Sequence, residues 1–260
     1  MTSAISNLQT LQFDTKLNYA CVDKIYYICT DNELNFKLKQ QREYKIMRIL
    51  TLILTSFVLN AFAYSGQILN SVESNLPSTE KYLFYFHGSK QEEGQFISNW
   101  EDIIKELAKT APYVISENRS STEPNDYAER IVEQVKSLMN SGVSPTNISI
   151  SGYSKGAVIA LAVASKLQNK DIKFILLSGC SNSMNSKFEI DTKEIQGNFL
   201  AIYDSKDNKF GSCKSTLMES NSLRLEEKQL NSGKGHKLFA IPKSKFMNQW
   251  ANPLFEFSDL

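Results

Sequence analysis

A serine flanked by glycines is the first feature of this sequence that could carry chemistry. The segment Gly152-Tyr153-Ser154-Lys155-Gly156 matches the pattern G-x-S-x-G. In that pattern a tight strand-to-helix turn strains the serine backbone and exposes its hydroxyl. The glycines leave room where strand and helix crowd together. Glycine and serine are also common in ordinary turns, so a plain tight turn is the competing interpretation.

A serine hydroxyl becomes an effective nucleophile when a neighbouring base removes its proton, and histidine is suited to this near neutral pH. The chain has two histidines, His87 and His236. A carboxylate that orients the imidazole completes such a site, and Asp204 and Asp207 stand close together in one turn. These residue types favour nucleophilic catalysis by Ser154. The serine segment lacks the glycine patterns of nucleotide-binding turns, which disfavours nucleotide binding there.

Short apolar runs alternate with helical patterns along the part of the chain that must position these residues. The runs predict buried strands at 82–86, 113–116, 148–151, 174–178 and 199–203 and a more exposed strand at 222–230. The helical spacing predicts helices at 96–107, 127–139, 154–167 and 244–257. This alternation indicates an α/β fold with a mostly parallel sheet and helices on both faces. The serine turn then lies between a strand and a helix, as a catalytic serine of this type requires.

With these landmarks in order, the chain resembles the α/β-hydrolase superfamily over about residues 80–257. The family order of serine, acid and histidine implies that His236 is the general base. The family register after the strand at 199–203 implies that Asp207 is the acid. Asp204 stays open as the alternative, because it lies nearer the strand end.

The resemblance also implies an oxyanion hole made of two backbone N–H groups. One belongs to Lys155, the residue after the nucleophile. The other belongs to Ser89, which follows the His87-Gly88 dipeptide at a strand end. His87 is then expected to be a structural hydrogen-bonding residue. The segment between 178 and 199 is short, so we expect a minimal fold with no large lid, which favours small or exposed acyl substrates.

Composition excludes several classes of function. The 260 residues include 29 Lys and Arg against 28 Asp and Glu, a formal net charge of +1, so no nucleic-acid partner is expected. The four cysteines and two histidines show no zinc-binding spacing, and neither a metal nor another cofactor is expected.

The segment 47–63 has the order of a secretory signal peptide. Arg48 is followed by an apolar run at 49–59 and by small residues at Ala61 and Ala63. The run is shorter than the roughly 20 residues of a membrane-spanning helix, so a membrane anchor or a buried core helix is the lesser alternative. We expect cleavage near Ala63 and export of one domain, residues 64–260, to a periplasm or the medium, with no stable membrane span in the mature chain.

Residues 1–46 lack a sustained helical or strand period. They are either a cytoplasmic extension or, as we favour, an artefact of a gene model that should start at Met47. Cys180 and Cys213 are either a disulfide or two buried thiols.

The sequence therefore predicts an exported serine hydrolase, most simply a carboxylesterase that acts on a small-molecule acyl substrate through an acyl-enzyme. Thioesterase, amidase and peptidase chemistry use the same three residues. A non-catalytic binding protein of the same fold is the alternative from another class, and it would place His236 far from Ser154.

Overall fold

The computed structural model describes residues 39–49, 65–218, 220–222 and 224–260. The chain divides into two units, Met1–Phe62 and Ala63–Leu260. The boundary lies one residue from the expected cleavage point after Ala63. Most of the segment 47–63 lies outside the described residues, so the signal peptide and its cleavage stay predictions.

Within the first unit, residues 39–49 form an exposed helix. The sequence does not predict this helix, because residues 1–46 lack a sustained helical period. The segment contains Lys39, Gln40, Gln41, Arg42 and Glu43, all of high helix propensity, which favours a helix here. None of the helices in the described residues is long and apolar enough to cross a membrane.

The second unit contains a seven-stranded sheet in the order β1-β3-β2-β4-β5-β6-β7, and every neighbouring pair is parallel. Its described strands are β1 (Gln67–Leu69), β2 (Tyr82–Phe86), β3 (Tyr113–Ile115), β4 (Ile148–Tyr153), β5 (Lys173–Leu177), β6 (Asn198–Asp204) and β7 (Arg224–Leu230). All six expected strands are present. The short edge strand β1 is additional.

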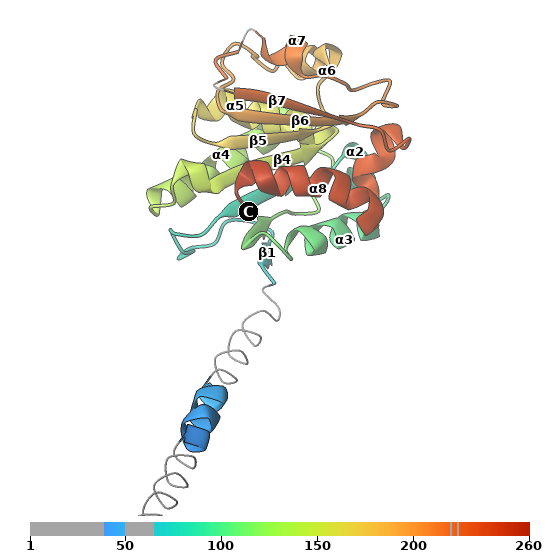
Figure 1. Cartoon of the computed structure of the whole chain (residues 1–260). Coiled ribbons are helices and arrows are strands. Elements are labelled where there is room, and N and C mark those ends of the chain that lie inside the picture. The colour runs from blue at the N-terminus through green and yellow to red at the C-terminus, as the bar shows by residue number, and fades with distance from the viewer. Residues whose placement is uncertain (1–38, 50–64, 219, 223) are drawn as a thin grey trace, which may run out of the picture. The chain divides into compact units, whose positions relative to one another are not determined.

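The helices lie on both faces of this sheet (Figure 1). They are α2 (Ser89–Glu92), α3 (Ile97–Leu107), α4 (Pro124–Asn140), α5 (Lys155–Leu167), α6 (Asn182–Lys187), α7 (Lys214–Leu217) and α8 (Ser244–Ser258), with 3-10 turns η1 (Pro145–Asn147) and η2 (Gly235–Ala240). The four expected helices correspond to α3, α4, α5 and α8. The turns and the helices of four to six residues are too short for a helical period to reveal them.

Two hydrophobic clusters occupy the two faces of the sheet, and β2 contributes to both. Tyr82, Phe84 and Phe86 pack with α4 and α5. Leu83 and Tyr85 pack with α3 and α8. Because alternate side chains of a strand point to opposite faces, the continuous apolar run at 82–86 is what a strand covered on both sides requires.

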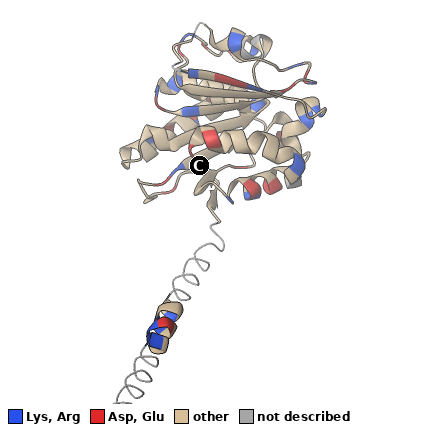
Figure 2. Ribbon diagram, in the orientation of Figure 1, with Lys and Arg blue, Asp and Glu red and all other residues tan. Residues whose placement is uncertain are grey.

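The C-terminal end of α8 is held at the beginning of the parallel strands. Lys173, the first residue of β5, donates to the Asp259 carboxylate at 2.6 Å and to the Ser258 carbonyl at 3.3 Å. Lys81, which directly precedes β2, donates to the Asp259 carbonyl. Basic and acidic residues are interspersed over the rest of this unit (Figure 2).

Candidate active site

Ser154 occupies a strained turn between β4 and α5. Its backbone angles are φ 56° and ψ −119°, in a region that residues with a side chain rarely adopt. Strain of this kind costs roughly 1–3 kcal/mol and persists where the surroundings enforce it. Here the Ser154 N–H donates to the Leu177 carbonyl at 3.0 Å, which ties the turn to the end of β5.

The two glycines of the turn allow the backbones to approach closely. A Cβ at Gly156 would lie 2.1 Å from the Phe86 carbonyl oxygen, and a Cβ at Gly152 would lie 2.1 Å from the Gly156 carbonyl oxygen. Neither distance is possible between non-bonded atoms. The glycines thus let α5 begin directly against the end of β2.

The structure brings Ser154, His236 and Asp207 into one line of hydrogen bonds. Nε2 of His236 lies 2.9 Å from Oγ of Ser154, and Nδ1 of His236 lies 2.7 Å from Oδ2 of Asp207. A carboxylate only accepts, so Nδ1 carries the proton and Nε2 accepts from the serine hydroxyl. Ser154 follows β4, Asp207 follows β6 and His236 follows β7. The carboxyl ends of parallel strands share one edge of a sheet, which is why these distant residues meet.

Asp207 is fixed by its own turn. Its Oδ1 accepts from the backbone N–H groups of Lys209 at 3.0 Å and Phe210 at 3.1 Å. Its side chain is 1% exposed, whereas that of His236 is 28% exposed. The acid is therefore buried and immobilised, and the imidazole is partly open to solvent.

Asp204, the alternative acid, serves the loop that leads to His236. Its carboxylate accepts from Lys206 N–H at 2.9 Å, from Ser232 N–H at 2.8 Å and from Gly235 N–H at 3.1 Å. The Ser232 hydroxyl also donates to it, at 2.5 Å. Burial raises the pKa of this carboxyl, but these hydrogen bonds outweigh burial and leave the pKa below its usual value. The carboxylate that contacts His236 is that of Asp207.

Two aromatic rings pack against the imidazole of His236. The Phe210 ring is stacked on it with centroids 4.7 Å apart, and the Tyr153 ring lies 5.1 Å away. Burial, with a smaller effect from Asp207, raises the pKa of the Tyr153 hydroxyl far above neutral pH. Both rings restrict the orientation of the imidazole without adding a charge. Tyr153 directly precedes Ser154 and Phe210 lies three residues after Asp207, and neither carries any other sequence signal.

The residues expected to supply oxyanion N–H groups lie beside the serine. Lys155 and Ser89 begin α5 and α2, and the first N–H groups of a helix have no acceptor within that helix. A Cβ at Gly88 would lie 3.4 Å from the Ser154 Cβ, so the loop that carries Ser89 packs directly on the serine turn.

His87 is a buried hydrogen-bonding residue. Its Nε2 accepts from Arg119 N–H at 3.0 Å, and its Nδ1 lies 2.9 Å from the Gly88 carbonyl, to which it donates as the neutral ring. Burial and, to a smaller extent, the Arg119 cation lower its pKa to about 3. The ring therefore stays neutral at physiological pH, and its partners differ from those of His236.

Glu92 and Arg119 are charged residues near the site that sequence reasoning does not identify. They form a 2.7 Å ion pair in which both side chains are almost fully buried. Arg119 follows β3 and Glu92 ends α2, 27 residues earlier. Only the fold brings them together, and no local pattern indicates their pairing.

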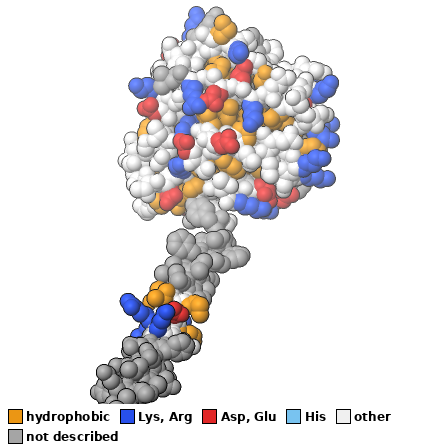
Figure 3. Space-filling view, viewed as in Figure 1, with side chains coloured by type: hydrophobic (Ala, Val, Ile, Leu, Met, Phe, Trp, Pro, Cys, Tyr) orange, Lys and Arg blue, Asp and Glu red, His pale blue; other side chains and the backbone are white. Residues whose placement is uncertain are grey.

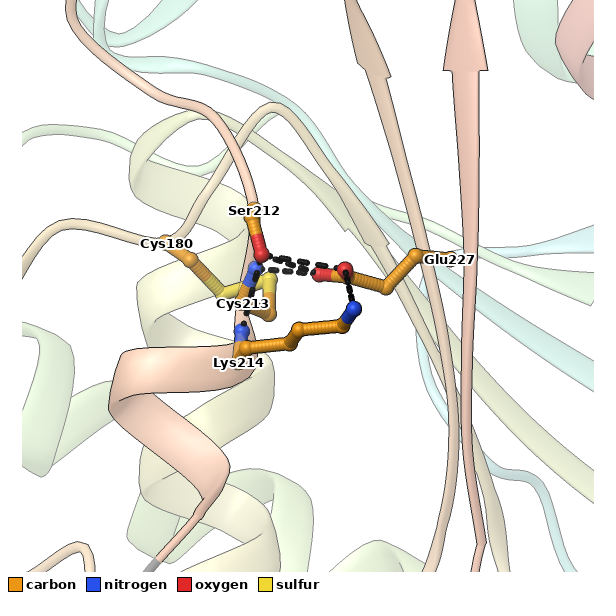
Figure 4. Close-up of a disulfide and its surroundings, with 5 residues drawn as sticks. All are labelled: Cys180, Ser212, Cys213, Lys214 and Glu227. Carbon is orange, nitrogen blue, oxygen red and sulfur yellow. Dashed lines mark hydrogen bonds and ion pairs between the residues drawn. A yellow bond between two sulfur atoms is a disulfide. The ribbon is translucent and has the colours of Figure 1, made fainter.

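Cys180 and Cys213 form a disulfide, which settles the open choice between a bond and two thiols (Figure 4). Cys180 follows β5, and Cys213 ends the loop between β6 and α7, which carries Asp207. The Cys213 N–H donates to the Glu227 carboxylate on β7 at 2.6 Å, and the Ser212 hydroxyl donates to the same carboxylate at 2.8 Å. The loop that carries Asp207 is thus tied to the rest of the unit at its far end.

A separate groove lies between β7 and α8, with a volume of about 490 Å³. Apolar side chains lie among basic and acidic ones on this face (Figure 3). None of Ser154, Asp207 and His236 lines this groove. Among the described residues, no cluster of three or more His, Cys, Asp or Glu side chains could hold a metal ion.

Comparison with solved structures decides the fold. An arylesterase structure aligns with 69% of this chain and 76% of its own, at a TM-score of 0.52 and 14% identity. The chain has the α/β-hydrolase fold. The fold implied by the sequence resemblance is therefore confirmed, with a minimal sheet that is parallel throughout its described strands.

Two other solved structures are also similar, at lower TM-scores. A lipase-esterase related protein from Clostridium acetobutylicum ATCC 824 covers 70% of this chain and 96% of its own, at 15% identity and TM-score 0.44. SOBER1 from Arabidopsis thaliana covers 66% and 98%, at 16% identity and TM-score 0.44. No protein-family model matches this chain, and no curated protein matches it.

Proposed function

We propose that this protein is an exported serine hydrolase, most simply a carboxylesterase that cleaves small acyl esters. The observation that carries the proposal is the hydrogen-bonded line from Ser154 Oγ through His236 to Asp207, with distances of 2.9 and 2.7 Å. A nucleophile, a base and an orienting acid in this arrangement are the elements of acyl transfer through a covalent intermediate.

In the acylation step, Oγ of Ser154 attacks the ester carbonyl carbon while its proton moves to Nε2 of His236. The backbone N–H groups of Lys155 and Ser89 donate hydrogen bonds to the carbonyl oxygen and stabilise the negative charge that develops on it. The tetrahedral intermediate then breaks its bond to the alkoxy oxygen, which takes the proton from His236 and leaves as an alcohol. The acyl group remains as an ester of Ser154.

In the deacylation step, a water molecule replaces the alcohol. His236 removes a proton from the water as its oxygen attacks the acyl carbon, and the same N–H groups stabilise the second oxyanion. Collapse of this intermediate returns the proton to Oγ of Ser154 and releases a carboxylic acid. Asp207 stabilises the imidazolium that forms in each step.

Labelling with a fluorophosphonate probe tests the nucleophile. Wild-type protein is expected to label and Ser154→Ala is not. Ser151→Ala is the matched control, because it removes a buried hydroxyl from the same strand without touching the proposed machinery. A folded wild-type protein that does not label overturns the proposal and favours the non-catalytic binding protein. That alternative expects a distant His236, and the 2.9 Å contact with Ser154 argues against it.

The substrate class is tested by a hydrolysis profile of the mature chain. Esters, thioesters and amides of the same acyl group are compared at graded acyl length. We expect the highest kcat/KM for short acyl esters. Highest activity on a thioester or amide replaces the carboxylesterase assignment while keeping the serine mechanism.

The disulfide supports export, because disulfides persist in oxidising compartments. The expected signal segment 47–63 would direct the chain there. N-terminal sequencing of exported protein tests the cleavage, and sequencing of the uncleaved precursor tests the proposed start at Met47. A mature chain that begins at Tyr64 is expected, and an N-terminus within 1–46 would show that the extension is translated and retained.

A further inference from the structure

The carboxylate of Glu92 lies between two cations. Its Oε1 accepts from Nε of Arg119 at 2.7 Å, and its Oε2 accepts from Nζ of Lys155 at 2.7 Å. The side chains are 3%, 2% and 12% exposed for Glu92, Arg119 and Lys155. This is a buried three-residue ion cluster within the candidate site.

Each cation has a second partner that reaches another segment of the site. Arg119 donates through Nη2 of the same guanidinium group to the His87 carbonyl at 2.5 Å, two residues before Ser89. Lys155 donates to the Thr122 carbonyl at 2.6 Å, in the segment after β3. Glu92 therefore links α2, the segment after β3 and the first residue of α5.

These links join the two segments that carry the proposed oxyanion donors. Ser89 is the first residue of α2, and Glu92 is its last. Lys155 supplies its backbone N–H to the proposed oxyanion hole and its ammonium to Glu92. Charge-assisted hydrogen bonds between buried groups are short and directional, and a buried ion left without its partner is strongly unfavourable. The cluster thus resists any change in the spacing between α2 and the start of α5.

We propose that Glu92 is a positioning residue, which sets the spacing of the Ser89 and Lys155 N–H donors by holding Lys155 and Arg119 on its two carboxylate oxygens. This inference rests on the proposed serine hydrolase function. Oxyanion donors act only when they are placed where the charge develops, so their spacing affects the transition state rather than substrate binding.

Glu92→Gln tests the proposal, with Glu93→Gln as the matched control. The control makes the same change one residue away, in an exposed ion pair with Lys90. For Glu92→Gln we expect kcat to fall about tenfold or more with KM nearly unchanged, and a boronic acid that mimics the tetrahedral intermediate to bind more weakly by a similar factor. The control should keep wild-type values for both. A purely structural role would lower the Tm without changing kcat per folded molecule.

Lys155→Met provides a second variant that keeps the backbone N–H and the Glu92–Arg119 pair. We expect the same loss of kcat and of boronic acid affinity. If either variant folds and retains wild-type kcat, the positioning role is wrong while the serine mechanism stands on the Ser154→Ala result. If the wild-type protein neither labels nor hydrolyses any acyl substrate, the proposed function fails, and the positioning role fails with it.

Discussion

The Oδ1 atom of Asp204 accepts a 3.1 Å hydrogen bond from the N–H of Gly235, which directly precedes His236. Two aspartates three residues apart thus act on the same histidine in different ways. Asp207 contacts the imidazole, whereas Asp204 holds the backbone from which the imidazole projects. A pair of identical substitutions separates these roles.

Asp207→Asn should affect catalysis far more than stability. The amide cannot orient Nδ1–H of His236 or stabilise its charged form, and we expect kcat to fall by roughly 10³–10⁴. Steady-state hydrolysis and thermal unfolding of the same preparation measure the two effects. A kcat within tenfold of wild type would falsify the assignment of Asp207 as the acid.

Asp204→Asn should affect stability. The side-chain amide of Asn cannot accept all four of the hydrogen bonds that the Asp204 carboxylate receives. Buried N–H or O–H groups that lose their acceptor lower the free energy of unfolding by roughly 2–3 kcal/mol. Urea unfolding at pH 7 measures the loss. We expect a smaller fall in kcat than for Asp207→Asn, and the reverse ranking of the two variants would exchange their roles.

His87 should make the protein less stable in mild acid. Its folded pKa of about 3 lies below that of an unfolded histidine, near 6.5, so the unfolded state binds the extra proton between these values. Stability therefore falls as the pH drops through this window, by about 2 kcal/mol between pH 7 and pH 5. Urea midpoints across the range measure it. His87→Gln, which keeps a donor and an acceptor, should flatten the dependence, and an unchanged slope would contradict it.

Removal of the disulfide should lower stability. The bond joins residues 33 positions apart, for which loss of loop-closure entropy in the unfolded chain gives about 3–4 kcal/mol. The Cys180→Ala, Cys213→Ala double variant should show this loss by urea unfolding. Free-thiol titration of denatured wild-type mature chain should find none, and two thiols would mean that the bond does not form.

Gly156→Ala should disrupt the serine turn. The added Cβ would lie 2.1 Å from the Phe86 carbonyl, so strand and helix must separate. We expect a loss of several kcal/mol or failure to fold. Gly211→Ala is the control, because a Cβ there meets no atom within 4 Å. Equal unfolding midpoints for the two variants would show that the close approach is absent.

Sequence patterns predict the helices and strands in which buried side chains recur at regular spacing. Strand β2 is apolar at every position because both faces are covered, and α3 repeats its apolar residues with helical spacing. Strand β1 has three residues, one of them half-buried and two exposed, so no pattern marks it. The helix at 39–49 is exposed along its length, so no buried stripe marks it, although residues of high helix propensity begin it.

At the site, local sequence indicates the groups placed by turns at strand ends. Ser154 has a motif, and Asp207 and His236 follow from family order. Glu92 and Arg119 depend on pairing between distant segments, which chain order does not encode. The contact with His236 likewise distinguishes Asp207 from Asp204 only in the folded protein, because both stand in one turn and their carboxylates point in different directions.

The anchoring of Asp259 by Lys81 and Lys173 has a practical consequence. These lysines lie where parallel strands begin, and β1 starts close to Ser65, so both ends of the described domain emerge on the side away from the strand ends that carry Ser154. An affinity tag or a carrier surface joined at either end therefore leaves the strand ends beside Ser154 free. Immobilised or fused forms should hydrolyse short acyl esters as readily as the free protein does.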